Sequence, residues 1–517
     1  MGLRSQYMVT IFVAGLWAIS LLYGEMFAFW VPLFSCTWPA LKDGSTAGNT
    51  HVKSIKIALI PDPQITHKDA GGASVTNMKF SEFYSDIYMR RAFRSSVLEM
   101  YPDRVIILGD LLEGGSLLSD PEWEALHRRF EHVFDQSQRV SQGLERVPVD
   151  YLPGIQDLGS VDVQSKVPEI RSRNEAAFGA LEYSINVGGA EFLFTNPRAF
   201  DGLESSMKEN ASWGLLSKIS SDDEVQPPRV LFTSVPLYKP SNAPCRAKKN
   251  DESVRRTLSL NADKPEEYLT SETTTRLLNL TKPIMVVSAH GRHVCSMNHT
   301  TVYGSIIEHT AGTFNWLQEN LYPSFMMISV ASEPVSGSSD LVSVSVCFLP
   351  VQTRIYAWYL VSLVSGLLAI FAWPTQGVDL YGVVVKVHQY FREIFRPDGG
   401  VKLKDEDADN GDWEMMWDAE GGMHLVKAQK VVSATGNATQ GGDRRGSAFA
   451  RSAARRQSAL DLEESVMTME SNLKDTVTMR AKTHMLPIRL LQALGPLAVL
   501  ASSSLSLYVM LLMKDWT

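Results

Sequence analysis

The sequence is short of cysteine, of basic residues and of internal repeats. Only four cysteines occur among 517 residues, acidic residues outnumber basic residues by 57 to 49, and we find no repeated segment. A net charge of -8 gives no reason to expect a nucleic-acid partner. The length allows one large domain with additional segments.

Long apolar runs are present at three places. The first, 8–34, follows a short tail, 1–7, and exceeds the roughly 7–15 apolar residues of a cleavable signal peptide, so we interpret it as an uncleaved signal anchor. The runs 355–373 and 490–513 contain no charge, and each is long enough to span about 30 Å of hydrocarbon. A buried core helix is the alternative for each run, although such long core helices usually keep a polar face.

Basic residues near the ends of these runs predict how the chain crosses the membrane. They lie after the second run and before the third: Lys386, Arg392, Arg396, Lys402, Lys404, Arg480, Lys482 and Arg489. By the positive-inside rule the connecting loop, 374–484, is cytosolic, and its polar composition predicts that it is largely disordered. The tail 1–7 is then cytosolic too, and 35–354 faces the lumen of the endoplasmic reticulum or Golgi. Sequons at Asn210, Asn279 and Asn298 agree, whereas a fourth, Asn437, falls on the cytosolic side.

All four cysteines fall in the expected lumenal segment, where oxidising conditions favour disulfides over metal thiolates. Three pairings are possible. We favour Cys245 with Cys295, and Cys36 with Cys347, because the second pair would join the two ends of the domain nearest the membrane. The sequence leaves the other pairings open.

Short apolar runs alternate with helical stretches between residues 50 and 347, which is typical of an α/β fold. The predicted strands read IKIALI, RVIIL, VDYL, EFLF, RVLF and IMVVS. Helices are predicted over 80–101 and 121–134, with Asp120 as the cap of the second helix and Pro121 at its first position. The later runs SFMMISV and LVSVSVCFL are expected to close a second sheet.

Polar side chains follow two of these strands directly. Asp62 and Gln64 come after IKIALI, and Asp110 comes after RVIIL. Two-metal phosphoester hydrolysis needs carboxylates and imidazoles at strand ends to hold the cations and to activate water. One such aspartate is a weak signal, and the two together are a stronger one.

The motifs, taken in order, resemble the eukaryotic calcineurin-like phosphoesterases that remove ethanolamine phosphate from GPI anchors. They read PDPQ (61–64), DIYMRRAF (86–93), GD (109–110), PGIQDLG (153–159), TSVPLYK (233–239), SAHGRHVC (288–295), TFNW (313–316) and YPSF (322–325). The resemblance implies a four-layer metallophosphoesterase β-sandwich flanked by helices over 50–347, together with transmembrane helices. It also implies divalent Mn, Zn or Fe as cofactor, and GPI-anchored proteins or GPI glycolipid in the membrane as partners.

The resemblance assigns the metal ligands and shows several departures. One metal would be held by Asp62, Gln64 and Asp110, with Arg292 in place of a histidine. The other would be held by Asp110 and His290, with Ile155 and Ser234 in place of Asn and His. Ile155 has no lone pair and Ser234 is a weak ligand, so we expect at most one tightly held metal.

The imidazole expected to assist the leaving group is replaced by Gln156, which cannot exchange a proton near neutral pH. Arg292 would neutralise the carboxylates and bind a phosphate oxygen, with His293 as a second candidate for the phosphate. Asp157 is expected to anchor its loop. We therefore expect a catalytically impaired protein, a pseudoenzyme, that binds a phosphorylated lipid glycan. The alternatives are an active enzyme with one metal, and a trafficking or scaffold protein that acts through its cytosolic loop.

Overall fold

The computed structural model describes sixteen parts of the chain, and the following statements refer to these residues: 2–41, 53–66, 75–159, 163, 167–197, 201, 213–214, 216–218, 227–240, 268–291, 293–317, 322–333, 341–372, 413–417, 423–427 and 494–516. The chain divides into two compact units. The larger unit comprises Val9–Ala369 and Ala498–Thr517, and the smaller comprises Met1–Met8 and Ile370–Leu497. In the smaller unit β12 (Trp413–Trp417) pairs with β13 (Met423–Lys427) as an antiparallel hairpin. This hairpin lies within the loop that we expect to be largely disordered.

The larger unit contains a five-stranded sheet with the strand order β11-β10-β1-β2-β3. Its strands are β1 (Ser54–Pro61), β2 (Arg104–Gly109), β3 (Val149–Pro153), β10 (Ser324–Ala331) and β11 (Val342–Phe348). The strands β1, β2 and β3 run parallel, whereas β10 and β11 are antiparallel to their neighbours.

A second sheet has six strands in the order β4-β5-β6-β7-β9-β8. They are β4 (Tyr183–Val187), β5 (Ala190–Thr195), β6 (Arg229–Thr233), β7 (Met285–Ser288), β8 (Cys295–Thr301) and β9 (Gly304–Thr310). Pairing is parallel from β5 through β6 and β7 to β9, and antiparallel at both edges. In each sheet the carboxyl ends of the parallel strands lie on the same side, and the candidate site lies at these strand ends.

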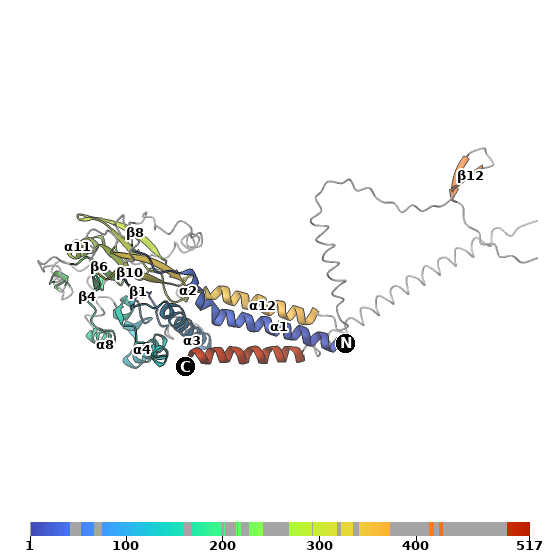
Figure 1. Cartoon of the computed structure of the whole chain (residues 1–517), viewed down its shortest axis with the longest axis horizontal. Helices are drawn as coiled ribbons and strands as arrows, with labels where there is room; N and C mark the ends of the chain where they lie inside the picture. The colour runs from blue at the N-terminus through green and yellow to red at the C-terminus, as the bar shows by residue number, and fades with distance from the viewer. Residues whose placement is uncertain are drawn as a thin grey trace, which may run out of the picture. The chain divides into compact units, whose positions relative to one another are not determined.

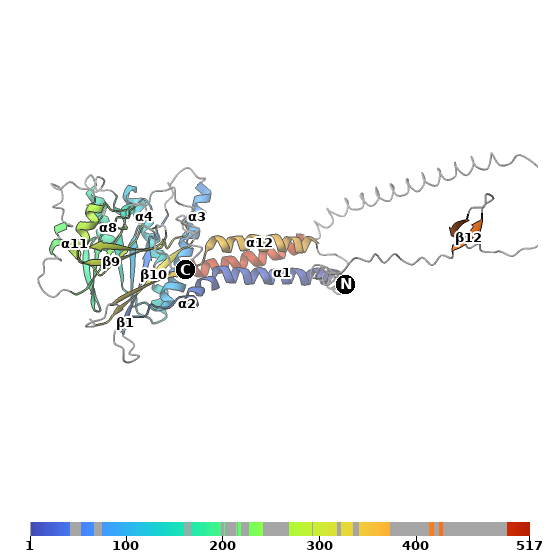
Figure 2. The same ribbon diagram turned by 90° about the horizontal axis from the view of Figure 1, so that it is seen from above.

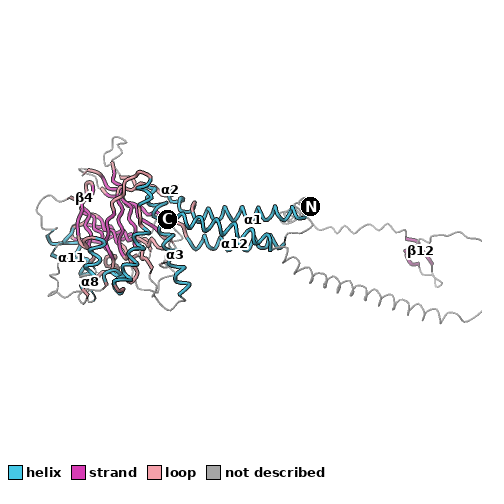
Figure 3. Tube along the Cα trace, turned by 90° about the horizontal axis from the view of Figure 1, so that it is seen from below, coloured by secondary structure: helices cyan, strands magenta, loops and turns pink. Residues whose placement is uncertain are grey.

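Alternation along the strands produces a four-layer arrangement (Figures 1 and 3). In β1, Ile57 and Leu59 join the core between the two sheets, and Ala58 and Ile60 join the core beneath the outer helices. Leu193 of β5 faces a third core that covers the second sheet. Burial of both faces explains why the central strands read as continuous apolar runs. The predicted four-layer sandwich is confirmed.

The domain part of the large unit contains the helices α2 (Val31–Ser35), α3 (Val75–Arg91), α4 (Asp120–Val133), α5 (Ser137–Ser141), α6 (Ile155–Leu158), α8 (Pro168–Phe178) and α11 (Ser271–Thr281). Of these, α3, α4 and α8 pack on the outer face of the first sheet, and α11 packs on that of the second. Shorter helical turns are η1 (Phe27–Trp30), η2 (Ala92–Val97), η3 (Leu98–Met100) and η4 (Gly115–Leu117). The helix predicted over 80–101 therefore consists of α3, a π-helical stretch and a final 3₁₀ turn.

Two sequence predictions about these elements are wrong. SFMMISV and LVSVSVCFL form β10 and β11. β10 pairs with β1 and β11 pairs with β10, so both strands belong to the first sheet and do not close the second. An apolar pattern identifies a strand but carries no information about its distant partner. The cap of α4 is Ser119, because Glu122 accepts hydrogen bonds from its backbone N–H and hydroxyl in a capping box.

Three helices are long and apolar enough to cross a membrane: α1 (Gly2–Glu25), α12 (Gln352–Ala372) and a C-terminal helix, Leu494–Trp516. Within the larger unit they run side by side from the domain, as both views show (Figures 1 and 2). A disulfide joins Cys36, after α2, to Cys347 in β11, and this pair is one of the two that we favour from the sequence. It links the chain segments that follow α1 and precede α12.

Candidate metal centre

Three predicted ligands lie at the carboxyl ends of parallel strands. Asp62 follows β1, Asp110 follows β2, and His290 comes two residues after β7 in the other sheet. Because the two sheets pack face to face, these ends meet, and one ligand atom from each residue lies within 4.8 Å of the others. The structure thus brings together residues that are up to 228 positions apart in the sequence.

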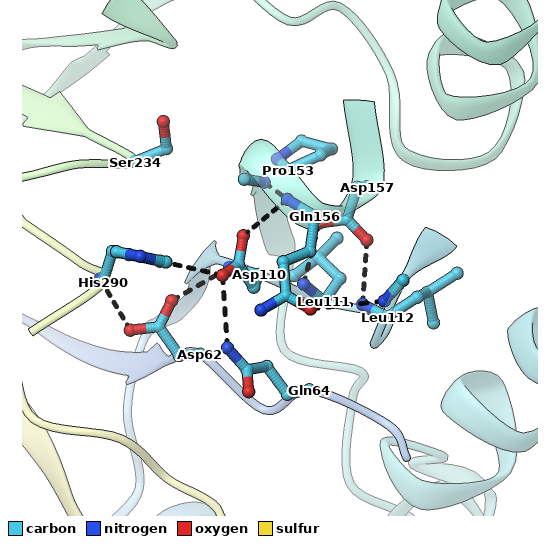
Figure 4. Close-up of polar contacts among 12 residues, drawn as sticks. Asp62, Gln64, Asp110, Leu111, Leu112, Pro153, Gln156, Asp157, Ser234 and His290 are labelled. Carbon is cyan, nitrogen blue, oxygen red and sulfur yellow. Dashed lines mark hydrogen bonds and ion pairs between the residues drawn. The ribbon is translucent and has the colours of Figure 1, made fainter. Parts of the chain in front are cut away.

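The four predicted ligands form one hydrogen-bonded cluster (Figure 4). His290 Nδ1 lies 2.8 Å from Asp110 Oδ2, and Gln64 Nε2 donates to the same oxygen over 3.2 Å. Asp62 accepts from the backbone N–H of Asp110 over 2.9 Å and from that of His290 over 2.7 Å. The loops after β1, β2 and β7 are therefore held together by hydrogen bonds between their residues.

The backbone at this cluster is strained. Asp62, Gln64 and His290 have φ values of 40°, 39° and 58°, in the left-handed region that non-glycine residues rarely adopt. Such residues cost on the order of 1–3 kcal/mol each and persist only where the surroundings hold them. The strain coincides with the predicted ligands, which is typical of functional sites.

Asn315 holds the strained loop after β1. Its side-chain amide donates to the carbonyls of Pro63 and Gln64, each over 3.1 Å, and its oxygen accepts from the Ser85 hydroxyl over 3.0 Å. Asn315 is fully buried. The motif TFNW carries this residue, but the sequence gives no sign that it acts on a loop some 250 residues away.

Two glycines allow the carboxylates to approach the backbone. A Cβ atom at Gly109 would lie 2.0 Å from Asp62 Oδ1, and one at Gly154 would lie 2.2 Å from Asp110 Oδ1. Gly109 also has a φ of 95°. A side chain at either position would displace a candidate ligand.

The two carboxylates suit a cation. Asp62 and Asp110 are both fully buried, and burial, followed by the nearby charge of Asp110, raises the pKa of Asp62 to about 7. Among the described residues no lysine or arginine pairs with either carboxylate, and Gln64 Oε1 is buried without a hydrogen-bond partner. These donors fit one divalent ion, because carboxylate, amide and imidazole are all suitable ligands for it.

The positions expected to hold a second metal are used differently. Ser234 follows β6, but its hydroxyl donates to Asn196 Oδ1 over 2.8 Å (Figure 4 shows it apart from Asp110). Ile155 begins α6 and offers no ligand atom. The side-chain oxygen of Gln156 accepts from the backbone N–H of Gly114 over 3.2 Å, so this side chain supports a neighbouring loop.

Sequence reasoning missed Asn196. Its amide donates to the carbonyl of Pro153 over 3.2 Å, and the residue is almost fully buried between the ends of β3 and β6. It directly follows β5, so the same strand-end rule that selects Asp62 and Asp110 would have found it. It fills the space near the missing second set of ligands.

Asp157 is placed as expected for a loop anchor. Its carboxylate accepts from the backbone N–H groups of Leu111 and Leu112, each over 2.8 Å, and from that of Gly154 over 3.0 Å. It therefore joins the loops after β2 and β3.

Two predictions fall on positions that the structure does not describe. Arg292 lies outside the described residues, so its expected place beside the carboxylates stays a prediction. Cys295 is disulfide-bonded, and its expected partner Cys245 lies outside the described residues. His293 comes just before β8, and its role toward a phosphate also stays a prediction.

The fold and the cluster together define the class of protein. A four-layer sandwich with Asp, Asp and His at the ends of parallel strands is the calcineurin-like metallophosphoesterase scaffold that the motifs predict, and this prediction is confirmed. Proteins of this fold use divalent metals.

Curated relatives agree with this class. The Mus musculus protein named Metallophosphoesterase 1 is 25% identical over 357 residues, which cover 66% of this chain and 83% of the relative. The Gallus gallus protein of the same name is 24% identical over 361 residues, with the same coverage. A Caenorhabditis elegans Metallophosphoesterase 1 homolog is 24% identical over 336 residues, 64% of this chain and 82% of the relative. No family model matches the chain.

Solved structures are more distant. A Saccharomyces cerevisiae serine/threonine phosphatase with similarity to human phosphatase PP5 is 10% identical with a TM-score of 0.24, over 65% of this chain and 89% of that one. A Vps29 variant from Entamoeba histolytica is 9% identical with a TM-score of 0.21, over 57% of this chain and 99% of that one. At these scores the matches support no argument about function.

Proposed function

We propose that the chain is a membrane-associated member of the metallophosphoesterase class that binds a phosphoester through one divalent cation and hydrolyses it poorly or not at all. The observation that carries this proposal is the contrast between the two halves of the site. Asp62, Gln64, Asp110 and His290 converge, whereas Ser234 and Gln156 are hydrogen-bonded to other groups.

The residues present can hold and orient a phosphoester. Asp62, Gln64, Asp110 and His290 would hold the cation, which would supply positive charge for a phosphate oxygen. Asp110 is held in place by the backbone N–H of Gln156 over 3.0 Å, so its carboxylate is preorganised. Gln156 cannot pass a proton to a leaving group, so the chain lacks a general acid at the position where the family resemblance expects one.

The proposed ligand is the ethanolamine phosphate of a GPI-anchor glycan. Support comes from the motif resemblance together with the three apolar helices, which would place the site beside a membrane that carries such lipids. The basic residues of the 374–484 loop favour a lumenal domain in the endoplasmic reticulum or Golgi. GPI-anchored proteins or free GPI glycolipid would then be the partners.

Metal content and turnover test this proposal. The full-length chain, purified in detergent, is analysed for bound Mn, Zn and Fe, titrated with phosphoethanolamine, and assayed with bis(p-nitrophenyl) phosphate. We expect one metal ion per chain, metal-dependent binding of phosphoethanolamine and negligible hydrolysis. Two tightly held ions, with turnover that disappears in Asp110→Asn, would refute the proposal.

An active enzyme with one metal is the second candidate. The convergence of two carboxylates and one imidazole favours it, because catalytic sites with a single metal commonly use three protein ligands and keep one position open. This candidate predicts metal-dependent hydrolysis that falls by orders of magnitude in Asp62→Asn. Unchanged turnover in that variant would exclude it.

A further inference from the structure

The second sheet ends in an edge strand, β8, which follows β9 at the end of the strand order. β8 pairs with β9 in an antiparallel ladder. In such a ladder every second residue of an edge strand directs its backbone N–H and C=O away from its neighbour. Among the described residues, no backbone group forms a hydrogen bond to the outer side of 296–301. This edge is therefore a template on which another strand could pair.

β8 lacks the features that usually prevent such pairing. Edge strands are commonly short, or carry a lysine, a proline or a bulge. β8 reads CSMNHTT over seven residues and contains no proline, lysine, arginine or acidic residue. Its register with β9 is unbroken, so no bulge turns it away. The imidazole of His299 is only 10% exposed and lies 2.7 Å from the Glu308 carboxylate, so it does not guard the edge.

Asn298 lies in the middle of this edge and begins the sequon Asn298-His299-Thr300. Asn298 and Thr300 are both exposed, and neither side chain forms a hydrogen bond with a described residue. Because successive side chains of a strand alternate between its faces, residues 298 and 300 lie on the same face. The folded domain therefore presents the acceptor amide and the hydroxyl of the sequon together.

The sequon at Asn279 is arranged differently. Asn279 is half-buried in α11, and the third residue of its sequon, Thr281, is buried and donates its hydroxyl to the carbonyl of Leu277 over 2.8 Å. Residues two apart on a helix lie roughly 200° apart around its axis, so Asn279 and Thr281 are on nearly opposite sides. Of these two sequons, that of Asn298 is the one that stays accessible in the folded chain.

Asn298 also lies beside an exposed apolar side chain. Its partner in the register with β9 is Ile307, which is 42% exposed. Directly opposed residues of an antiparallel pair have Cβ atoms about 4.5–5.5 Å apart and lie on the same face. A sugar attached to Asn298 would therefore cover Ile307 and hold a bulky, hydrated group over the open edge.

We propose that Asn298 carries an N-linked glycan, and that this glycan keeps the edge of β8 from pairing with a second copy of the chain. The donor is an oligosaccharide linked to a lipid diphosphate. A bond forms between Nδ2 of Asn298 and the anomeric carbon of the sugar, and the bond from that carbon to the diphosphate oxygen breaks. The lipid diphosphate leaves, and one amide proton is released to water.

This modification requires the lumenal placement of the domain proposed above and does not depend on metal binding. The full-length chain is expressed in eukaryotic cells, purified in detergent and treated with peptide N-glycosidase F in heavy-oxygen water. We expect mass spectrometry to find heavy-oxygen deamidation at Asn298. Thr300→Ser, which keeps the sequon, should retain the glycan, whereas Thr300→Ala should lose it. An unmodified Asn298 in the parent chain would overturn the proposal.

Protease treatment of sealed microsomes separates this proposal from the lumenal placement. We expect the domain to be protected from added protease. A protected domain with an unmodified Asn298 would overturn the glycan alone, and a digested domain would overturn the lumenal placement together with the glycan.

Two substitutions at the same position test the role of the glycan at the edge. Asn298→Gln removes the glycan and leaves an uncharged edge, so it should self-associate at a protein concentration about tenfold or more below that of the parent chain. Asn298→Lys also removes the glycan but places a charge on the edge, and it should remain as monomeric as the parent. Asn279→Gln, on α11, is the control and should behave like the parent.

Light scattering after size-exclusion chromatography in detergent measures this association over a range of concentrations. Equal association by Asn298→Gln and the parent chain would overturn the shielding role. Association of Asn298→Lys as strong as that of Asn298→Gln would overturn it too, because pairing along β8 should be weakened by a charge in the middle of the strand.

Discussion

The hydroxyl of Ser234 donates a hydrogen bond to Asn196 over 2.8 Å and is thereby turned away from the carboxylate of Asp110. Asn196 is itself bonded to the carbonyl of Pro153, so the pair occupies the space between the ends of β3 and β6. A buried hydroxyl held in this way is not available as a ligand. The candidate centre is therefore limited to the residues after β1, β2 and β7.

Restoring the missing side chains should restore a second metal. The variant Ile155→Asn/Gln156→His/Ser234→His returns two ligands and one imidazole that can transfer a proton. We expect a second bound ion and a phosphodiesterase rate at least about a hundredfold above the parent chain, since general acid catalysis contributes roughly 10²–10⁴-fold. Metal analysis and hydrolysis of bis(p-nitrophenyl) phosphate measure both quantities.

The matched control is Ser234→Ala, which removes the hydroxyl and adds no ligand, and it should bind no additional ion. The imidazole of Ser234→His must displace Asn196, so the triple variant is also checked for folding by thermal unfolding. A folded triple variant that still holds a single ion would contradict our assignment of the second site.

Asp110 should dominate metal affinity. Its Oδ2 atom contacts both Gln64 and His290, and its carboxylate is fully buried. Asp110→Asn removes the charge at nearly constant shape, and we expect metal affinity to fall about a hundredfold or more. Isothermal titration with Mn or Zn measures this. The control Asp120→Asn changes a carboxylate that is 84% exposed and should have no effect.

Metal binding should depend on pH near neutrality. Burial and the adjacent charge of Asp110 raise the pKa of Asp62 to about 7 in the metal-free chain, so this carboxyl is largely protonated below that pH. A cation binds the deprotonated form and must displace the proton. Metal affinity should therefore rise as pH increases from 5 to about 7 and level off above. In Asp62→Asn the affinity is lower and the rise with pH should be smaller, because the His290 imidazole must still bind the metal in its neutral form. A rise of unchanged size would assign the dependence to another group.

Much of this centre can be predicted from the sequence because buried parallel strands have a simple signature. IKIALI and RVIIL are apolar on both faces, so each strand end and the aspartate after it can be located directly. β8 was not predicted, because it is an edge strand with polar residues and partial exposure. The sheet to which β10 and β11 belong was predicted wrongly, because β10 pairs with β1, a strand some 270 residues earlier in the sequence.

The supporting residues are harder to predict than the ligands. Asn315 acts on Gln64 only because the loop after β9 packs beside α3, and nothing local in the sequence encodes that contact. By contrast, Ser119 and Glu122 form a local S-x-x-E pattern that identifies the cap of α4.

Removing the Asn315 amide should destabilise the strained loop. Asn315→Ala leaves the buried carbonyls of Pro63 and Gln64 without donors, at a cost of about 1–3 kcal/mol, and frees the positive-φ segment. We expect weaker metal binding together with a lower unfolding temperature. Asn186→Ala, at an exposed position of β4, is the control. Full metal affinity in Asn315→Ala would show that the loop holds its geometry without this residue.

Arg91 should hold the helices to the domain. Its guanidinium pairs with Glu25 at the end of α1 and, over 2.6 Å, with Asp515 at the end of the C-terminal helix, and Glu25 is almost fully buried. Arg91→Met leaves these carboxylates without their cation, and breaking such a buried pair costs about 3–5 kcal/mol. We expect a lower unfolding temperature in detergent and faster proteolysis near the C-terminal helix.

A triple variant separates the contribution of the Arg91 charge to stability from the contribution of its packing. The triple variant Arg91→Met/Glu25→Gln/Asp515→Asn lacks the buried negative charges, so it should regain a large part of the stability that Arg91→Met loses. Arg128→Met, at a side chain that is 67% exposed, should unfold like the parent chain. If the triple variant is no more stable than Arg91→Met, the contribution of Arg91 comes from packing. In that case the ion pairs are not what joins the two helices to the domain.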